Sequence, residues 1–164
     1  MHARSNLSPL FHSACLAAIT LSFIVLAAFI PRPIFAAACT PTEPDALGPF
    51  YKAGAPERES VGKGYVLMGM VRSSADCSAV KGARIELWLA GPDGGYGDDY
   101  RAIVFSDASG SYRFQSNFPP AYAGRPPHIH LRVSAKGFET LVTQHYPAKG
   151  KTEAIFDLVL VPAQ

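Results

Sequence analysis

Proline and glycine occur so often in this chain that few stretches are long enough to form a helix. The 164 residues include 14 prolines and 14 glycines. Proline blocks the interior of a helix and glycine favours turns, so this frequency argues against a helical bundle. A hydrophobic content of 48% with 17% charged residues still allows a packed core and excludes a disordered chain. The length fits one domain of short strands joined by turns.

Beyond residue 63 the hydrophobic residues recur with a period of two, which is typical of strands. The segments that we expect as strands are 65–71, 83–90, 102–105, 111–115, 128–133, 139–145 and 155–160. The four residues Asp107 to Gly110 between two of these segments indicate a hairpin turn. About seven to eight short strands with frequent turns predict an all-β fold, a β-sandwich.

The N-terminus has the three parts of a secretory signal. Arg4 precedes an uncharged, mostly apolar run from Ser13 to Ile30, and alanines follow at 36–38. We expect cleavage beside these alanines. The run is also long enough to span a membrane, so an uncleaved anchor stays open as an alternative. A lipoprotein site at Cys39 is a third interpretation, and all three place the body in the periplasm or outside the cell.

The chain then divides into three parts. Residues 1–38 form the secretory leader or membrane anchor, 39–63 an extended N-terminal arm, and 64–164 the β-sandwich domain. Four prolines in the arm forbid a regular helix there.

The balance of charge gives no case for a nucleic-acid partner. The chain has 15 Lys and Arg against 13 Asp and Glu, and Arg4 and Arg32 lie in the first 36 residues, where no acidic residue occurs. The rest of the chain is therefore neutral overall, whereas nucleic-acid binders concentrate positive charge.

The cysteines outside the leader are Cys39 and Cys77. In an exported protein, two cysteines most simply form one disulfide, which would pin the arm to the body. Two unrelated thiols are the alternative. A CxxC-type metal or redox site is excluded, because the two cysteines are far apart and no second pair exists.

Two histidines, His128 and His130, alternate within a predicted strand. Both imidazoles would then face one side, with their Cα atoms about 7 Å apart, which suits two adjacent positions on one metal ion. Such a pair is also common as a surface or hydrogen-bonded feature. Arg125, three residues earlier, would disfavour a bound cation unless anionic ligands lie nearby.

Tyr96, in a glycine-rich loop, and Tyr122, in a proline-rich loop, are the candidates for anionic ligands. Two phenolates with two imidazoles form a hard set that suits Fe(III) rather than Zn(II) or Cu(I). The alternative is that both are loop or interface aromatics whose hydroxyls contact water. A hydrolytic zinc site lacks a convincing third nitrogen or carboxylate ligand.

Six segments in a fixed order resemble a known family. They are GPFYKAGAP at 48–56, CSAVKGARIELWLA at 77–90, GGY at 94–96, SDASGSYRF at 106–114, PPAYAGRPPHIHLRV at 119–133 and TQHY at 143–146. The fifth is the most specific, because it combines a tyrosine, an arginine and an HxH pair at fixed offsets. From Leu47 to Pro147 the chain resembles the intradiol ring-cleavage dioxygenases, non-haem ferric enzymes that open catechols between their two hydroxyls.

This resemblance implies a β-sandwich with non-haem Fe(III) held in strand-end loops, by Tyr96, Tyr122, His128 and His130. It implies three further roles: Arg125 stabilises negative charge, Gln144 supports that arginine, and Pro49 helps to wall the substrate pocket. Trp88 matches a family tryptophan below the site, and a plain core aromatic is the equal alternative. No family role transfers to His145, which we expect to be a strand-end residue.

The implied reaction inserts both atoms of O2 into a catechol-type ring and gives a cis,cis-muconate-type product. Tyr122 would take up a substrate proton as general base. The competing hypothesis is a catalytically silent exported β-sandwich that serves as a binding module, since fold does not settle function.

The chain departs from the family in two ways that bear on the substrate. A leader stands in place of the helical N-terminal dimerisation domain of the catechol enzymes, so a homo-oligomer is neither implied nor excluded. The loop between Tyr122 and His128 is short and lacks a pocket tryptophan of the protocatechuate enzymes. We expect a small neutral pocket that takes catechol, a substituted catechol or hydroxyquinol rather than protocatechuate.

Overall fold

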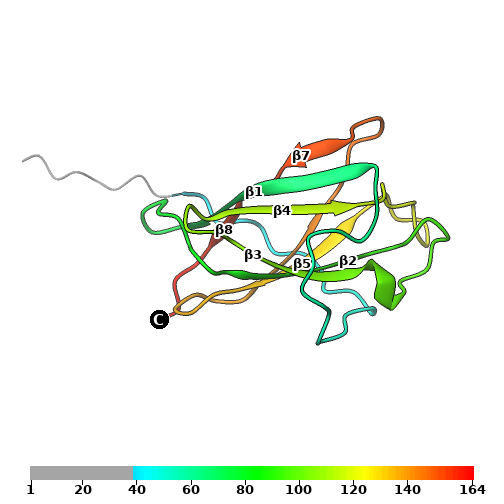
Figure 1. The fold of residues 1–164 in the computed structure, drawn as a ribbon. Helices are drawn as coiled ribbons and strands as arrows, with labels where there is room; N and C mark the ends of the chain where they lie inside the picture. The colour runs from blue at the N-terminus through cyan, green and yellow to red at the C-terminus, as the bar shows by residue number, and fades with distance from the viewer. Residues whose placement is uncertain (1–38) are drawn as a thin grey trace, which may run out of the picture. The chain divides into compact units, whose positions relative to one another are not determined.

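The structure is a computed structural model, and it describes residues 39–164. The leader and its interpretations lie outside these described residues. Eight strands form two four-stranded sheets, which Figure 1 shows facing each other. This arrangement confirms the predicted all-β sandwich. No helix within residues 39–164 has the length and apolar character needed to cross a membrane.

One sheet is built around the long strand β1 (Tyr65–Ser73). β4 (Ser111–Ser116) pairs antiparallel with one edge of β1. On the other edge, β7 (Glu153–Ile155) and β8 (Leu158–Leu160) run parallel to successive parts of β1.

The second sheet has the order β3-β2-β5-β6, and every pair in it is antiparallel. Its strands are β2 (Arg84–Leu89), β3 (Arg101–Phe105), β5 (Ile129–Ser134) and β6 (Leu141–His145). A short 3-10 turn, η1 (Asp98–Tyr100), precedes β3. The alternating apolar residues of both sheets meet between them, and the side chains of Leu67, Phe114, Ile85, Leu87 and Leu131 are fully buried there.

The single strand predicted over 155–160 is wrong, because two strands occur there. Phe156 and Asp157 interrupt the ladder: the amide of Phe156 donates to the carbonyl of Met68 at 2.8 Å, and the Asp157 carboxylate accepts the amide of Met70 at 2.9 Å. The chain passes so close that a Cβ on Gly69 would lie 2.2 Å from the Phe156 oxygen. This close approach requires glycine at position 69.

The hairpin predicted at Asp107 to Gly110 is also wrong. The turn forms, because Asp107 Oδ1 accepts the amides of Ser109 and Ser111 at 2.8 and 2.9 Å. It joins β3 to β4, however, and these strands belong to different sheets. The turn is therefore a corner of the sandwich rather than a link between paired strands.

The arm crosses both sheets without forming a regular strand. Cys39 is joined to Cys77 by a disulfide, with Cα atoms 5.2 Å apart. Next along the arm, the amide of Asp45 donates a hydrogen bond to the Val142 carbonyl in β6 at 2.9 Å. Farther along, single bridges join Glu57 to β3 and Ser60 to β4.

Candidate metal centre

One cavity collects most of the residues that the sequence singled out. It has a volume of about 250 Å³. Its lining residues are Pro49, Phe50, Tyr96, Tyr122, Ala123, Arg125, His128 and His130. Three segments far apart in the sequence therefore meet here: the arm, the loop before η1, and the proline-rich loop that leads into β5.

The sheet holds the inner side of the cavity. His130 lies in β5 opposite Trp88 of β2, and the two rings stack with centroids 4.9 Å apart and planes 2° apart. Trp88 thus supports an imidazole directly and is more than a core aromatic. At the Cε1 edge of the ring, a Cβ on Gly48 would lie 2.9 Å from His130 Cε1, and Gly48 has a φ of +73°. Glycine is required there on both counts.

His128 lies just before β5 rather than inside it, which corrects the predicted strand 128–133. The two imidazoles still converge, with ring centroids 4.8 Å apart. His128 Nδ1 lies 2.8 Å from the Pro126 carbonyl. A carbonyl only accepts, so Nδ1 carries the hydrogen and Nε2 presents its lone pair to the cavity.

Tyr96 and Tyr122 close the opposite side. Their rings lie 5.3 Å apart and are nearly perpendicular. The Tyr96 hydroxyl lies 2.9 Å from His128 Nε2. Arg101, nearly buried at the start of β3, donates to the Tyr96 carbonyl at 3.1 Å and holds that loop in place.

A tight turn sets the position of Tyr122. The backbones of Tyr122 and Arg125 exchange two hydrogen bonds, of 3.2 and 2.8 Å. Between them Ala123 and Gly124 both have positive φ, at 47° and 79°. Positive φ at both central residues defines the type I′ hairpin turn, and Ala123 is strained by about 1–2 kcal/mol in this conformation. The turn places the phenol and the guanidinium side by side.

Arg125 is held from β6. Its Nη2 donates to Gln144 Oε1 and to the Tyr146 hydroxyl, each at 2.8 Å. Gln144 is 5% exposed, and its Nε2 donates to the Ala46 carbonyl at 2.6 Å. The arginine and the glutamine that the resemblance paired are thus in direct contact.

The donor set fits a ferric ion. Two donors bound to one ion at about 2.0–2.1 Å are held roughly 3 Å apart, close to the separation of the Tyr96 oxygen and His128 Nε2. His130 Nδ1 is buried and forms no hydrogen bond of good geometry within residues 39–164, although the Ala46 backbone is near enough to raise the pKa of this imidazole against the larger lowering by burial. Phenol oxygens with imidazoles match hard Fe(III).

The same region lacks a conventional acidic or thiolate metal site. Within the described part of the chain, no three His, Cys, Asp or Glu side chains gather closely enough to hold a metal ion.

Burial controls the protonation of the candidate ligands. It lowers the pKa of His130 to about 4, with a smaller contribution from neighbouring His128. It raises the pKa of Tyr96 above that of a free tyrosine, partly offset by Arg125. At neutral pH the imidazole of His130 is therefore ready to bind a cation, whereas the Tyr96 phenol loses its proton only if a cation favours the phenolate.

Sequence reasoning missed three residues beside this cavity. Phe50 stacks on Tyr96, with centroids 4.3 Å apart, and meets Tyr122 edge to face at 5.4 Å. Tyr146 and Asp45 extend the contacts of Arg125. Phe50 and Tyr146 occur within the GPFY and TQHY segments, so a signal was present, whereas nothing around Asp45 marked it.

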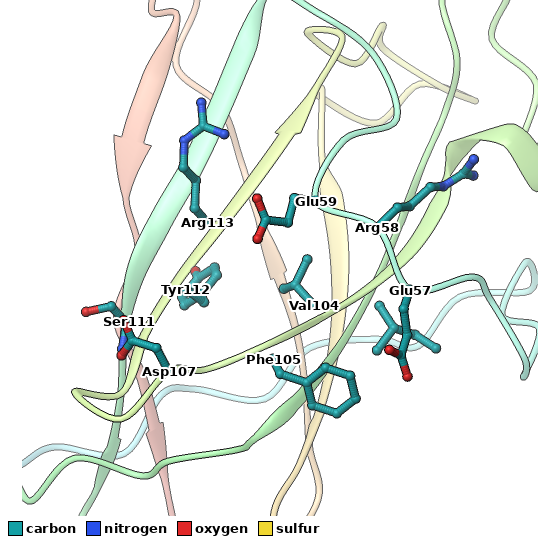
Figure 2. A pocket seen from close by; sticks show the side chains of 10 residues that line it. Glu57, Arg58, Glu59, Val104, Phe105, Asp107, Ser111, Tyr112 and Arg113 are labelled. Carbon is teal, nitrogen blue, oxygen red and sulfur yellow. The ribbon is translucent and has the colours of Figure 1, made fainter.

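His145 and a second surface hollow lie apart from these contacts. The half-buried His145 has its Nε2 2.7 Å from the hydroxyl of Tyr65, a core residue. The hollow has a volume of about 470 Å³, and Glu57, Arg58 and Glu59 of the arm pass β3 and β4 there (Figure 2). It contains none of the residues predicted for the site, so we assign it no part in the chemistry.

Comparison with curated proteins finds similarity to 1,2-dioxygenases of catechols and of hydroxyquinol. It is 32% identical over 142 residues to the chlorocatechol 1,2-dioxygenase of Pseudomonas putida, a match covering 66% of this chain and 54% of the relative. It is 33% identical over 140 residues to the hydroxyquinol 1,2-dioxygenase of Rhodococcus opacus, covering 65% and 46%. The chain thus spans about half the length of these relatives. No protein-family model matches it.

Solved structures give the same result for the fold. The dioxygenase domain of a dioxygenase carbohydrate-binding protein fusion from Streptomyces sp. SirexAA-E superimposes with a TM-score of 0.66 and 28% identity. That match covers 76% of this chain and 100% of the domain. The chlorocatechol 1,2-dioxygenase structure from Pseudomonas putida gives a TM-score of 0.61 at 24% identity, covering 70% of each chain.

Proposed function

Since this chain belongs to the intradiol ring-cleavage dioxygenases, we propose that it is a non-haem Fe(III) enzyme that inserts both atoms of O2 into a catechol-type ring. Cleavage falls between the two hydroxyls and gives a cis,cis-muconate-type product. The observation that carries the proposal is the convergence of Tyr96, Tyr122, His128 and His130 on one cavity.

These four residues would hold the iron. When bound, a ferric ion supplies a Lewis-acidic centre that takes both catechol oxygens and makes the ring reactive toward O2. The tautomer of His128 is already set by the Pro126 carbonyl, and the His130 ring is packed against Trp88 and Gly48. Little reorganisation is therefore needed to form the site.

The tyrosine at the turn is the proposed general base. Tyr122 is half-buried at the edge of the cavity, on a turn with exposed central residues. If the entering catechol displaces Tyr122 from the iron, the freed phenolate faces the cavity. It can then accept a hydroxyl proton from the catechol. Tyr96, stacked against Phe50, stays in place.

Arg125 stabilises the negative charge that develops on the oxygenated ring. It is the single Lys or Arg among the residues that line the cavity. Both of its hydrogen bonds to described side chains use Nη2, so its Nε and Nη1 hydrogens have no side-chain acceptor among the described residues. Fixed donors in a site of low polarity are worth far more than the same groups in water.

The lining of the cavity indicates the substrate class. Pro49, Phe50 and Ala123 give it an apolar wall, and no Asp, Glu or Lys lines it. With Arg125 committed to the reaction, no second cation remains in the lining to bind a ring carboxylate. We propose catechol, a substituted catechol or hydroxyquinol as substrate, in preference to protocatechuate.

The test is oxygen uptake by the iron-loaded protein with a panel of catechols, with products identified by mass and ultraviolet spectrum. We expect a wine-red protein, coloured by tyrosinate-to-iron charge transfer, and muconates from at least one catechol. A yellow semialdehyde would mean cleavage beside the hydroxyls and would overturn the intradiol assignment. A red protein without turnover would leave the binding module as the function.

We propose further that the body is exported. The leader pattern of residues 1–38 supports this, and so does the disulfide between Cys39 and Cys77, since disulfides persist in oxidising compartments. Mass spectrometry of the mature protein from its own cell tests the proposal. A chain found in the cytoplasm with its leader intact would contradict it.

A further inference from the structure

A chain of hydrogen bonds leads from the cavity to the arm. Arg125 Nη2 donates to the Tyr146 hydroxyl at 2.8 Å, and that hydroxyl donates to Asp45 Oδ2 at 2.8 Å. Asp45 is itself held on β6, because its amide donates to the Val142 carbonyl. The arm therefore reaches the guanidinium through two side chains that the proposed mechanism does not use.

The direction of these hydrogen bonds follows from Asp45. A tyrosine hydroxyl has one hydrogen, and Tyr146 has two acceptors in reach: Asp45 Oδ2 at 2.8 Å and Gln144 Oε1 at 3.2 Å. The nearer, charged acceptor takes the hydrogen. The lone pairs of Tyr146 and the carbonyl oxygen of Gln144 then both remain available to Arg125.

Without Asp45 the hydroxyl of Tyr146 would change its acceptor. Tyr146 would donate its hydrogen to Gln144 Oε1 and so compete with Arg125 for that oxygen. The amide of Gln144 would also lose a partner, since its Nε2 lies 3.5 Å from Asp45 Oδ1 beside its bond to Ala46. One carboxylate on the arm thus sets the orientation of both residues that hold the guanidinium.

The consequence for Arg125 is geometric. A primary guanidinium nitrogen has two hydrogens, and Nη2 uses one for Gln144 and one for Tyr146. Two bonds from one nitrogen fix the plane of the group as well as its position. Gln144 alone would leave that plane free to rotate.

We propose that Asp45 and Tyr146 are positioning residues for the reaction. Asp45 orients Tyr146, and Tyr146 together with Gln144 locks the guanidinium plane of Arg125 at the cavity. This inference rests on the proposed function for its kinetic consequences, but its structural content does not depend on turnover.

The first test uses the metal-free protein and nitrogen-15 NMR of arginine side chains. We expect separate, slowly exchanging signals for the two Nη2 hydrogens of Arg125, assigned by their loss in Arg125→Lys. In Tyr146→Phe and Asp45→Ala these signals should merge, while Asp45→Asn, which keeps one acceptor oxygen, should be intermediate. Signals that stay separate in both Tyr146→Phe and Asp45→Ala would overturn the proposal.

Tyr51→Phe is the matched control. Tyr51 lies in the arm and, like Tyr146, donates its hydroxyl hydrogen to a carboxylate, here that of Glu86 at 3.1 Å. Its loss should leave the Nη2 signals unchanged. Thermal unfolding of every variant excludes a general loss of structure, and an effect of Tyr51→Phe equal to that of Tyr146→Phe would contradict a specific role.

The second test uses the iron-loaded protein and catechol. We expect Tyr146→Phe and Asp45→Ala each to lower kcat about tenfold, with KM within about twofold and the charge-transfer band unchanged. Because the two residues act in one chain, the double variant should be no slower than the worse single variant. Effects that multiply would overturn the proposal. Absent turnover in the unmodified protein would refute the proposed function instead, and the NMR result would still decide the positioning.

Discussion

The two walls of the cavity are held in place by different means. His128 and His130 are each 2% exposed; His130 belongs to the antiparallel sheet through β5, and His128 directly precedes that strand. Tyr122 and Arg125 lie on a two-residue turn, and their position depends on the arm and on side-chain hydrogen bonds. The histidine wall therefore takes its geometry mainly from the pairing of β5 with β2. The tyrosine–arginine wall takes its geometry from the strained turn at Ala123 and from the arm, which is distant in sequence.

Breaking the histidine wall should have the largest effect. We expect His130→Ala to abolish retention of iron, measured by metal analysis after gel filtration. His145→Gln is the control, because burial lowers the pKa of both imidazoles to about 4 but His145 contacts Tyr65 instead of the cavity. Equal loss of iron from the His145 variant would show that the ligand set is misassigned.

Releasing the arm should mainly affect the other wall. The variant with both Cys39→Ser and Cys77→Ser loses the cross-link, and we expect the free energy of unfolding to fall by about 2–4 kcal/mol. Iron should be retained, since the pairing of β2 with β5 and the stacking on Trp88 hold His130 without the cross-link, while kcat should fall. Denaturant unfolding and metal analysis measure this, and reduced unmodified protein should behave alike. Loss of iron with turnover per iron intact would refute the division into two walls.

Straining the turn tests whether its shape matters for turnover. Gly124→Ala places a side chain at a φ of +79°, which should cost about 1–2 kcal/mol of stability and lower kcat. Gly137→Ala is matched, because its φ is +83° and open space surrounds both positions. We expect it to cost the same stability, measured by denaturant unfolding, without slowing the reaction. Similar losses of kcat in both variants would mean that stability alone explains the effect.

The smallest effect concerns the histidine outside the cavity. Burial lowers the pKa of His145 from 6.5 to about 4, so the unfolded chain binds a proton that the folded chain refuses in this interval. Stability of the metal-free protein should therefore be intact above pH 6.5 and decline as the pH falls toward 4. Urea unfolding at several pH values should show a shallower decline in His145→Gln. An identical slope in the variant would exclude His145 as a source.

Much of the fold was predictable because alternation in a strand is a local property. The segments expected around β1, β2, β4 and β6 match the observed strands to within a few residues. The wrong predictions of a hairpin at Asp107 to Gly110 and of one strand over 155–160 have one cause. Strand pairing depends on residues that are far apart in the sequence. Asp107 and its neighbours form the expected turn, but the sequence does not say that β3 and β4 join different sheets.

The site, like the fold, has a part that the sequence predicted and a part that it could not predict. The motif around Tyr122, Arg125 and the HxH pair specified residue types, and the structure gathers them with Tyr96 on one cavity. The sequence could not place Asp45 beside Tyr146, because they are 101 positions apart and nothing around Asp45 marks it. Nor could it show that Phe50 would stack on Tyr96.

The sequence by itself determined the alternation that makes strands, the turns at proline and glycine, and the family's pattern of tyrosines, histidines and arginine. Tertiary structure alone decided which strands pair, where the ladder breaks at Phe156, and how the arm crosses β6 to reach Arg125. The physical reason is the range of the interactions. Backbone propensity and side-chain alternation act over a few residues, whereas burial and hydrogen bonding join groups only after the whole chain has packed.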